Sequence, residues 1–292
     1  MEEKPIHIKF HNRQNPQSTF DIIDLDSVFR MKGLNHSPMN LHLVEFYLLL
    51  FIEEGEGQHT IDFTTYDYHK GALLTIRKDQ IHKFHRSDTV KGKLLLFTDA
   101  FLVSYLEKLE AIKSLQLFNE IIGVPKIQLG EQEFEEVSQL IYRIWTEYFD
   151  SNDDYSQGII RSELHILIAK LYRVKSNQNQ VIHNRKYLSE FIAYQNLIEQ
   201  HASQLTRVKD YADRLGMSTK TLNTVTQSIV HKSAKAFLDE IRTKQIKRLL
   251  INTSHSVKEI AFASGFEETT NFYKYFKRQV QKTPEQFRVT FL

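Results

Sequence analysis

Two short segments share a spacing of small residues that predicts nucleic-acid binding. They match when shifted by 49 residues, and they read Tyr211-Ala-Asp-Arg-Leu-Gly-Met217 and Ile260-Ala-Phe-Ala-Ser-Gly-Phe266. In each segment an alanine would permit the close crossing of two helices, and four residues later a glycine would supply the positive φ of a turn. This is the layout of a helix-turn-helix, whose second helix enters the major groove of DNA.

One such segment could belong to any helical hairpin with a glycine turn, whereas two copies at a fixed separation favour a paired DNA-binding unit. Ser218 is a suitable N-cap for the first recognition helix, and residues 236–251 predict one connecting helix between the two copies. About fifteen residues would span roughly 23 Å, against about 34 Å between successive major-groove faces on one side of a duplex. The expected apolar anchors of the two recognition helices are Met217, Leu222 and Val225, and Phe266, Phe272 and Phe276.

Basic residues concentrate in the same part of the chain. Residues 187–292 contain 16 lysines and arginines and 10 aspartates and glutamates, a net charge of +6. Residues 1–186 contain 22 basic and 26 acidic side chains, a net charge of −4, so the whole chain carries +2. A solvated basic face would give the same excess, but the asymmetry favours a polyanionic partner for the C-terminal part alone.

The overall composition bounds the class of protein. A chain of 292 residues with 41% hydrophobic and 25% charged residues is typical of a soluble globular protein of two domains. The absence of cysteine excludes a disulfide scaffold, a thiolate zinc site and a cysteine nucleophile. The longest apolar run, Phe46 to Ile52, is too short to span a bilayer, and the N-terminus lacks the features of a secretory signal. We therefore expect a cytoplasmic protein with no membrane partner.

The hydrophobic pattern changes along the chain from that of strands to that of helices. Strands are predicted up to about Phe97, and helices from Asp99 to about Val174. The polar stretch of residues 175–186 is interpreted as a linker, and everything after it reads as helical. The expected fold class is α+β, with a small β-barrel or sandwich and its helices in residues 1–174 and an all-α domain in residues 187–292. The predicted strands include residues 43–52, 72–76 and 93–97.

The second helix-turn-helix segment continues into a longer pattern. It includes Phe272, Phe276-Lys-Arg and Thr283-Pro-Glu-Gln-Phe-Arg288, and over about residues 190–290 the chain resembles the AraC/XylS family of bacterial transcription regulators. The resemblance implies two helix-turn-helix motifs that bind a double-stranded DNA operator. The family usually has glycine where His231 and Gln281 stand, so both recognition helices are expected to end differently, and it commonly has an aromatic residue where Thr226 stands.

The resemblance also implies which side chains contact DNA. Base contacts would come from the exposed N-terminal part of each recognition helix, where amides suit adenine edges, lysine suits guanine, and threonine can meet a thymine methyl group. About half of these positions are expected to touch bases, and the others would be solvated. Phosphate contacts are expected from Lys232, Lys277, Arg278 and Arg288. The base-contacting candidates are Thr219, Lys220, Asn223, Thr224 and Gln227, and Thr269, Thr270, Asn271, Tyr273 and Lys274.

The N-terminal part resembles the cupin sensor domain that often precedes this DNA-binding unit, over residues 46–57 and 71–76 and at His82. The resemblance implies a β-barrel that binds a small-molecule effector. The helices of residues 99–174 would form a homodimer, as in similar proteins, or pack against their own barrel. RNA polymerase would be a further partner if the protein is an activator.

Many cupins are metal-dependent enzymes, which leaves as an alternative a metal-dependent cupin enzyme with an accessory nucleic-acid-binding module. The cupin metal-ligand positions fall on His42, Val44, Leu48 and His82. Two of the four are aliphatic, and two histidines rarely retain a catalytic metal. We therefore predict no metal, no cofactor and no catalytic residue, and we expect these four residues to line an effector pocket. A helical interaction protein that does not bind DNA is a third interpretation.

Overall fold

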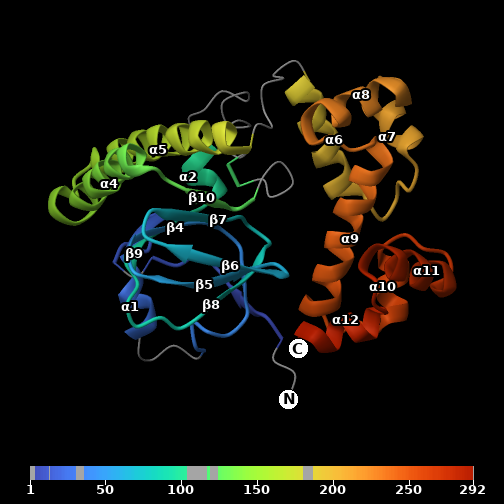
Figure 1. Ribbon diagram of the computed structural model, residues 1–292, viewed down its shortest axis with the longest axis horizontal. Helices are drawn as coiled ribbons and strands as arrows, with labels where there is room; N and C mark the ends of the chain where they lie inside the picture. The colour runs from blue at the N-terminus through green and yellow to red at the C-terminus, as the bar shows by residue number, and fades with distance from the viewer. Residues whose placement is uncertain are drawn as a thin grey trace. The chain divides into compact units, whose positions relative to one another are not determined.

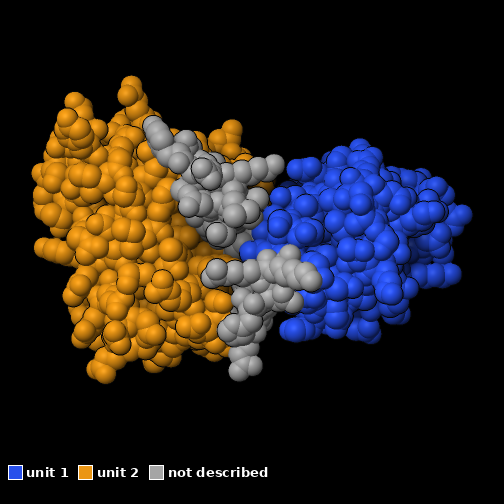
Figure 2. Space-filling model, turned by 90° about the horizontal axis from the view of Figure 1, so that it is seen from above, with its two compact units in different colours: residues 1–4, 181–292 blue, residues 5–180 orange. Residues whose placement is uncertain are grey.

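The computed structural model describes residues 4–12, 14–30, 36–103, 117–118, 124–179 and 187–291 (Figure 1). The chain divides into two compact units (Figure 2). The N-terminal unit comprises residues 5–180, and the C-terminal unit comprises residues 181–292 together with residues 1–4. Each unit has its own hydrophobic core.

Ten strands in the described part of the N-terminal unit form two five-stranded sheets. β1 pairs parallel with β3, and the other pairings are antiparallel. The first sheet has the order β1 (Ile6–Ile8), β3 (His42–Val44), β8 (Ile81–Phe84), β5 (Glu56–Ile61) and β6 (Thr64–His69). The second sheet has the order β10 (Lys126–Gln128), β7 (Ala72–Ile76), β4 (Tyr47–Glu54), β9 (Lys91–Phe97) and β2 (Phe20–Asp24).

β4 is buried on both faces, which explains its unbroken apolar sequence. Successive side chains of a strand point to opposite faces. Leu48 and Leu50 join the core between the two sheets, whereas Leu49 and Phe51 face the helices on the other side. The run of residues 43–52, predicted as one strand, is in fact two: β3 ends at Val44, and β4 begins three residues later in the other sheet.

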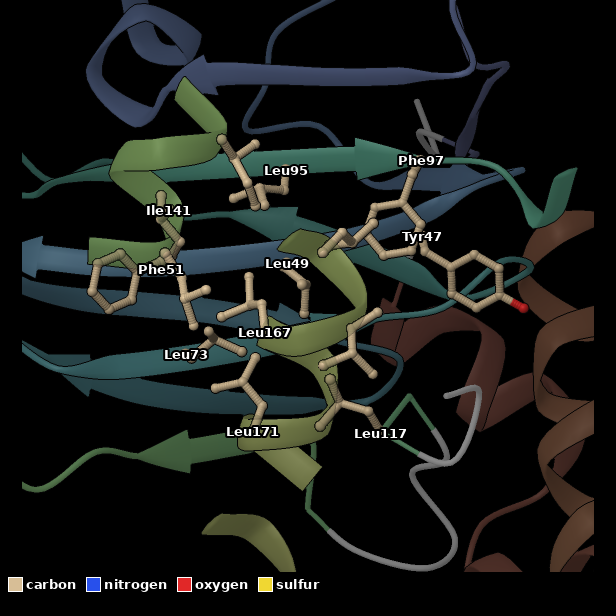
Figure 3. Close-up of a cluster of buried hydrophobic side chains, with 14 of the residues drawn as sticks. Tyr47, Leu49, Phe51, Leu73, Leu95, Phe97, Leu117, Ile141, Leu167 and Leu171 are labelled. Carbon is tan, nitrogen blue, oxygen red and sulfur yellow. The ribbon is translucent and has the colours of Figure 1, made fainter. Parts of the chain in front are cut away.

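Helices cover the outer face of the second sheet. Ile141 of α4 and Leu167 and Leu171 of α5 point toward the side chains of β4 and β7 (Figure 3). Of the two interpretations of the helical region, packing against the protein's own sheet is therefore correct for one face of these helices. The prediction of helices also covers residues 104–116 and 119–123, which lie outside the described residues. The elements are α1 (Leu25–Arg30), α2 (Asp99–Val103), α4 (Glu131–Thr146), the π-helical η1 (Glu147–Ser151) and α5 (Ser156–Asn179).

The predicted linker begins too early. α5 continues to Asn179, five residues into the stretch of residues 175–186. Lys175 is buried, and its Nζ donates a hydrogen bond to the carbonyl of Leu117 at 2.8 Å. Tertiary contact thus extends a helix through a sequence that reads as polar and aperiodic. The rest of the predicted linker, residues 180–186, lies outside the described residues.

The C-terminal unit is helical throughout its described residues. α9 runs through the unit, with α6, α7 and α8 around one end and α10, α11 and α12 around the other (Figure 1). Its 19 residues extend about 28 Å at about 1.5 Å per residue, which confirms the predicted connecting helix. The elements are α6 (Leu188–His201), α7 (Val208–Arg214), α8 (Thr219–Val230), α9 (Ala234–Asn252), α10 (Val257–Ala263), α11 (Thr269–Val280) and α12 (Pro284–Phe291).

The predicted α+β fold class is confirmed, with two sheets and their helices first and an all-α domain last. None of the helices in the described residues combines the length and the apolar character needed to cross a membrane.

Candidate nucleic-acid interface

The two helix-turn-helix units have the same turn geometry. Ala212 and Ala261 are buried at the helix crossings, and Gly216 and Gly265 have φ values of 65° and 80°. The N–H of the residue after each glycine donates to the carbonyl of the buried alanine, at 3.0 Å in the first unit and 3.1 Å in the second. The sequence repeat therefore encodes a repeat of backbone hydrogen bonds, as expected for glycine-terminated helices.

The recognition helices follow a slightly different repeat. α7 and α10 begin 49 positions apart, at Val208 and Val257, whereas α8 and α11 begin 50 positions apart, at Thr219 and Thr269. The second unit has one extra residue between the turn and its recognition helix, at Glu267-Glu268. With this offset, Thr226 is the counterpart of Phe276, and both side chains are fully buried.

Each recognition helix has one buried and one exposed face. The predicted anchors Leu222, Val225, Phe272 and Phe276 all lie in the core of the unit. Ten of the twelve residues predicted on α8 and α11 to contact bases or phosphates are exposed, and Thr269 and Tyr273 are half-buried. The structure thus brings the predicted residues together on the outer faces of two helices, and their contacts with DNA stay predictions.

Cationic side chains are denser on the second recognition helix. Lys274, Lys277 and Arg278 follow one face of α11, whereas Lys220 is the only basic residue of α8. Lys220, Lys274 and Lys277 have no carboxylate partner within 4.0 Å among the described residues. Their charge is therefore available to a phosphate.

Three of the predicted base-contacting side chains already have partners: the hydroxyl of Thr224 donates to the carbonyl of Lys220 at 3.1 Å, and Asn223 and Tyr273 also form hydrogen bonds. Asn223 Oδ1 accepts a hydrogen bond from the N–H of Ala234 at 2.9 Å, and its Nδ2 donates to the carbonyl of Thr219 at 3.0 Å. The hydroxyl of Tyr273 donates to Glu285 of α12, and this bond is the main cause that raises the Tyr273 pKa to about 12. Each side chain would have to exchange these bonds to reach a base.

Two of the predicted phosphate contacts have structural roles. Arg288 donates from Nε to the carbonyl of Leu250 at 2.9 Å and from a terminal nitrogen to the carbonyl of His255 at 2.7 Å. These bonds hold α12 against the carboxyl end of α9. The last backbone carbonyls of a helix have no hydrogen-bond donor within the helix. Lys232 forms an ion pair with Glu240 at 2.5 Å. Two nitrogens of Arg288 already donate to backbone carbonyls, and its expected phosphate contact stays a prediction.

The ends of the recognition helices do not differ as predicted. His231 and Gln281 adopt left-handed conformations with φ of 54° and 61°, the conformation that glycine would take there. The N–H of each donates to a carbonyl four residues earlier. Histidine and glutamine at these positions therefore leave the geometry of the helix ends unchanged. They make the left-handed conformation less favourable in free energy than glycine would.

The four residues expected to line an effector pocket are all buried. His42 and His82 lie opposite one another on β3 and β8, with ring centroids 5.7 Å apart. Val44 and Leu48 belong to the apolar core between the two sheets, so the four residues do share one interior.

Sequence reasoning missed a third interior histidine. His59 of β5 is fully buried, and its Nε2 lies 3.2 Å from Nδ1 of His82. Its Nδ1 has no hydrogen-bond partner among the residues that the structure describes. His59 and Ile61 lie on the same, inward face of β5. The pairing of β5 with β8 is what places His59 beside His82.

Burial keeps these imidazoles neutral. Desolvation lowers the pKa of His42 to about 4, assisted by the nearby His36, and lowers the pKa of His59 to about 3, assisted by His85 and His42. Burial also holds the pKa of His82 well below its usual range. A neutral imidazole offers one donor and one acceptor. Among the described residues, no group of three or more histidine, aspartate or glutamate side chains is arranged to hold a metal ion.

Comparison with known families and proteins agrees with both units. A helix-turn-helix domain model matches residues 211–290, and a model of the AraC-like ligand binding domain matches residues 33–168. The HTH-type transcriptional activator RhaS of Escherichia fergusonii is 23% identical over 249 residues, which are 85% of this chain and 86% of that protein. RhaS of Escherichia coli strain K12 is 20% identical over 247 residues, with the same coverage.

Among solved structures, fatty-acid-bound ToxT from Vibrio cholerae aligns with 92% of this chain and 94% of its own, at 16% sequence identity and a TM-score of 0.42.

Proposed function

Because the chain belongs to the AraC/XylS family of transcription regulators, we propose that α8 and α11 together read one operator and that a small molecule bound between the two sheets controls this binding. The members of this family and the RhaS relatives are DNA-binding regulators. This protein is likewise a DNA-binding regulator and not an enzyme. The interpretation as a metal-dependent cupin enzyme is therefore set aside.

The proposal that the protein binds a specific DNA sequence rests on the exposed faces of α8 and α11. Each of these helices follows a turn with the same backbone hydrogen bond. Selection from a random duplex pool should enrich one discrete sequence that is longer than a single helix-turn-helix half-site. Lys277→Ala should weaken binding and reduce the slope of log affinity against log salt by about one, because one phosphate contact is lost. Lys78→Ala, in the N-terminal unit, is the matched control. Failure of the selection to enrich any sequence would contradict the proposal.

The effector site is proposed at His42, His59 and His82. Three neutral imidazoles in an otherwise apolar interior suit a polar, uncharged molecule, and the unpartnered Nδ1 of His59 can hydrogen-bond to it. A metabolite panel is screened for compounds that change operator affinity. An active compound should lose its effect on His59→Leu, while the variant still binds DNA. An effect that survives in both His59→Leu and His82→Leu would place the site elsewhere.

A homodimer is proposed through the outer face of α5. Ile159 and Ile166 are seven residues apart on this face and 44% and 47% exposed, and Tyr155 just before the helix is 76% exposed. Apolar side chains at this spacing form a stripe that a second helix can cover. Sedimentation analysis of Ile159→Glu with Ile166→Glu should show a shift toward monomer. Val289→Glu, at an apolar position of α12 that is 70% exposed, should not.

An activating role with RNA polymerase as partner is also proposed, since both RhaS relatives are transcriptional activators. Transcription in vitro from a promoter that carries the selected operator should rise on addition of the protein. Reduced transcription at saturating protein would instead assign it the role of a repressor.

A further inference from the structure

The two halves of the C-terminal unit contact each other beside α9 as well as through it. The first half consists of α6, α7 and α8, and the second half consists of α10, α11 and α12 (Figure 1). A Cβ at Gly265, in the turn between α10 and α11, would lie 2.2 Å from the carbonyl oxygen of Ser203, in the turn after α6. The two backbones therefore touch, and glycine permits this close approach.

The corresponding turn of the first half has no such neighbour. A Cβ at Gly216 would meet no atom of the described residues within 4 Å. Both turns have a glycine with positive φ and the same backbone hydrogen bond, so their own geometry does not explain the difference. Of the two turns, the second alone takes part in a contact between the halves.

Arg242 of α9 holds the second turn from the inside of the unit. This residue is only 5% exposed, and a terminal nitrogen of its guanidinium donates a hydrogen bond to the carbonyl of Ser264 at 3.0 Å. Ser264 precedes Gly265 and is the C-cap of α10, where backbone carbonyls have no donor within the helix. A buried cation on the central helix therefore binds the backbone of the turn that touches α6.

The guanidinium of Arg242 lies close to side chains of both halves. It lies over the rings of Phe266, after the turn, and Tyr275 of α11, at 5.0 Å and 5.6 Å from the ring centroids. Burial raises the pKa of Tyr211 in α7 to about 12, and the nearby charge of Arg242 opposes this rise. Among the described residues no carboxylate lies within 4.0 Å of Arg242. Its place is therefore set by a carbonyl and by aromatic rings.

Each recognition helix is hydrogen-bonded to the backbone of α9. Asn223 of α8 accepts from the N–H of Ala234 at 2.9 Å, and the hydroxyl of Tyr275 in α11 donates to the carbonyl of Asp239 at 3.0 Å. Because the ring of Tyr275 also lies under Arg242, the cation helps to set the position of α11 on α9. The distance between α8 and α11 thus depends on the packing around Arg242.

We infer that Arg242 is a positioning residue that fixes the distance and angle between α8 and α11, and so restricts the protein to one spacing between the two half-sites of its operator. A connecting helix alone does not prevent each half from tilting on it. One additional base pair moves a half-site by about 3.4 Å and rotates it by about 35°, which a rigid pair of helices cannot follow. The part of the inference that concerns the operator rests on the proposed function, whereas the part that concerns the two helices does not.

Pulsed electron paramagnetic resonance between two spin labels measures the distance between the recognition helices directly. The chain contains no cysteine, so Gln227→Cys in α8 and Gln279→Cys in α11, both at exposed positions, provide two unique attachment sites. In the full chain without DNA we expect one narrow distribution of distances. Arg242→Met retains most of the buried volume but removes the charge and the donors. It should broaden the distribution at least about twofold, because the two halves can then tilt on α9.

Tyr194→Phe is the matched control. It removes a buried hydrogen bond at 3.0 Å from the Tyr194 hydroxyl to the carbonyl of Ala234, which joins the first half to α9 only. Its distribution should equal that of the parent protein. Arg242→Lys keeps the buried charge but lacks the planar fork, and it should broaden the distribution as well. A distribution as narrow in the folded Arg242 variants as in the parent, or equal broadening by Tyr194→Phe, would overturn the inference.

DNA binding then tests the consequence for the operator, with one base pair inserted or deleted between the half-sites of the selected sequence. The parent protein and Tyr194→Phe should bind both altered operators at least about tenfold more weakly, whereas Arg242→Met should bind all three within about threefold of one another. A spacing preference that Arg242→Met retains in full would contradict the inference. If the parent protein binds no operator, the proposed function fails, and the distance measurement, which uses no DNA, still decides the role of Arg242.

Discussion

The side-chain oxygen of Asn223, on the exposed face of α8, accepts a hydrogen bond at 2.9 Å from the N–H of Ala234, the first residue of α9. Ser233 caps the same helix by accepting from the N–H of Ala236 at 3.2 Å. The first turn of α9 is thus capped from two sides, once by its own N-cap residue and once by the recognition helix. Asn223 therefore positions α8 on the central helix of the unit.

Replacement of Asn223 by alanine should lower the free energy of unfolding of the C-terminal unit by about 1 kcal/mol, the usual cost of a lost cap. DNA affinity should fall by a similar factor on the operator and on all its single-base variants, because the helix as a whole is displaced. Asn223→Asp retains the acceptor and should recover most of the stability. A loss of affinity confined to one base pair would instead identify Asn223 as a base contact.

The two turn glycines should respond differently to alanine. A Cβ at Gly216 meets no atom within 4 Å, so Gly216→Ala should cost about 1 kcal/mol, for the positive φ alone. A Cβ at Gly265 would lie 2.2 Å from the carbonyl oxygen of Ser203, so Gly265→Ala should cost about 3 kcal/mol. Thermal unfolding monitored by circular dichroism checks the order, and equal losses would contradict it.

Glycine at the ends of the recognition helices should stabilise the protein. Gln281→Gly and His231→Gly each remove the penalty of a side chain in the left-handed region, for a gain of about 0.5–1 kcal/mol after the added freedom of the unfolded chain. Gln281→Ala is the control, because it removes the side chain but keeps the Cβ. A Gln281→Gly variant no more stable than Gln281→Ala would refute this explanation.

Arg288→Ala should destabilise the C-terminal unit by about 2 kcal/mol, since two carbonyls lose a charged donor. The salt dependence of DNA binding should stay that of the parent protein when affinities are compared below the melting transition. Arg288→Lys, which cannot donate along two directions from one plane, should recover only part of the stability. A shallower salt slope in Arg288→Ala would show that this residue contacts a phosphate after all.

Acidification should destabilise the N-terminal unit through its buried histidines. The folded-state pKa values of His42 and His59 are lowered to about 4 and about 3, whereas an unfolded histidine titrates near 6.5. Below pH about 6.5 the unfolded chain therefore binds protons that the folded chain does not, so stability is complete above this pH and is lost as the pH falls. The loss should reach about 1 kcal/mol per buried histidine at pH about 5.5.

Urea unfolding followed through Trp145, which lies in α4 of the same unit, measures this loss at several pH values between 7.5 and 5. His59→Gln should flatten the dependence, because one titrating group is removed. A pH-independent midpoint in the parent protein over this range would contradict the assignment of neutral buried imidazoles.

Local patterns were sufficient to predict most of the C-terminal unit. Helix boundaries there are set by residues close in sequence, such as Ser218 as an N-cap, Thr283 before Pro284, and glycine at the two turns. The 49-residue repeat does not predict the extra residue at Glu267-Glu268, because this residue follows the turn, beyond the two matching segments. The exposed faces of α8 and α11 followed directly from their apolar anchors.

The amino-acid sequence by itself determined the class of fold and the paired helix-turn-helix units, because these depend on short-range spacing, and the resemblance to cupin sensor domains singled out His42 and His82. Tertiary structure alone decided that His59 joins them, that Asn223 and Arg288 bind backbone atoms of α9, and that Arg242 binds the carbonyl of Ser264. Each of these relationships joins residues from separate elements. Strand pairing and helix packing create these contacts. The periodicity within one element does not identify the elements that pack against it.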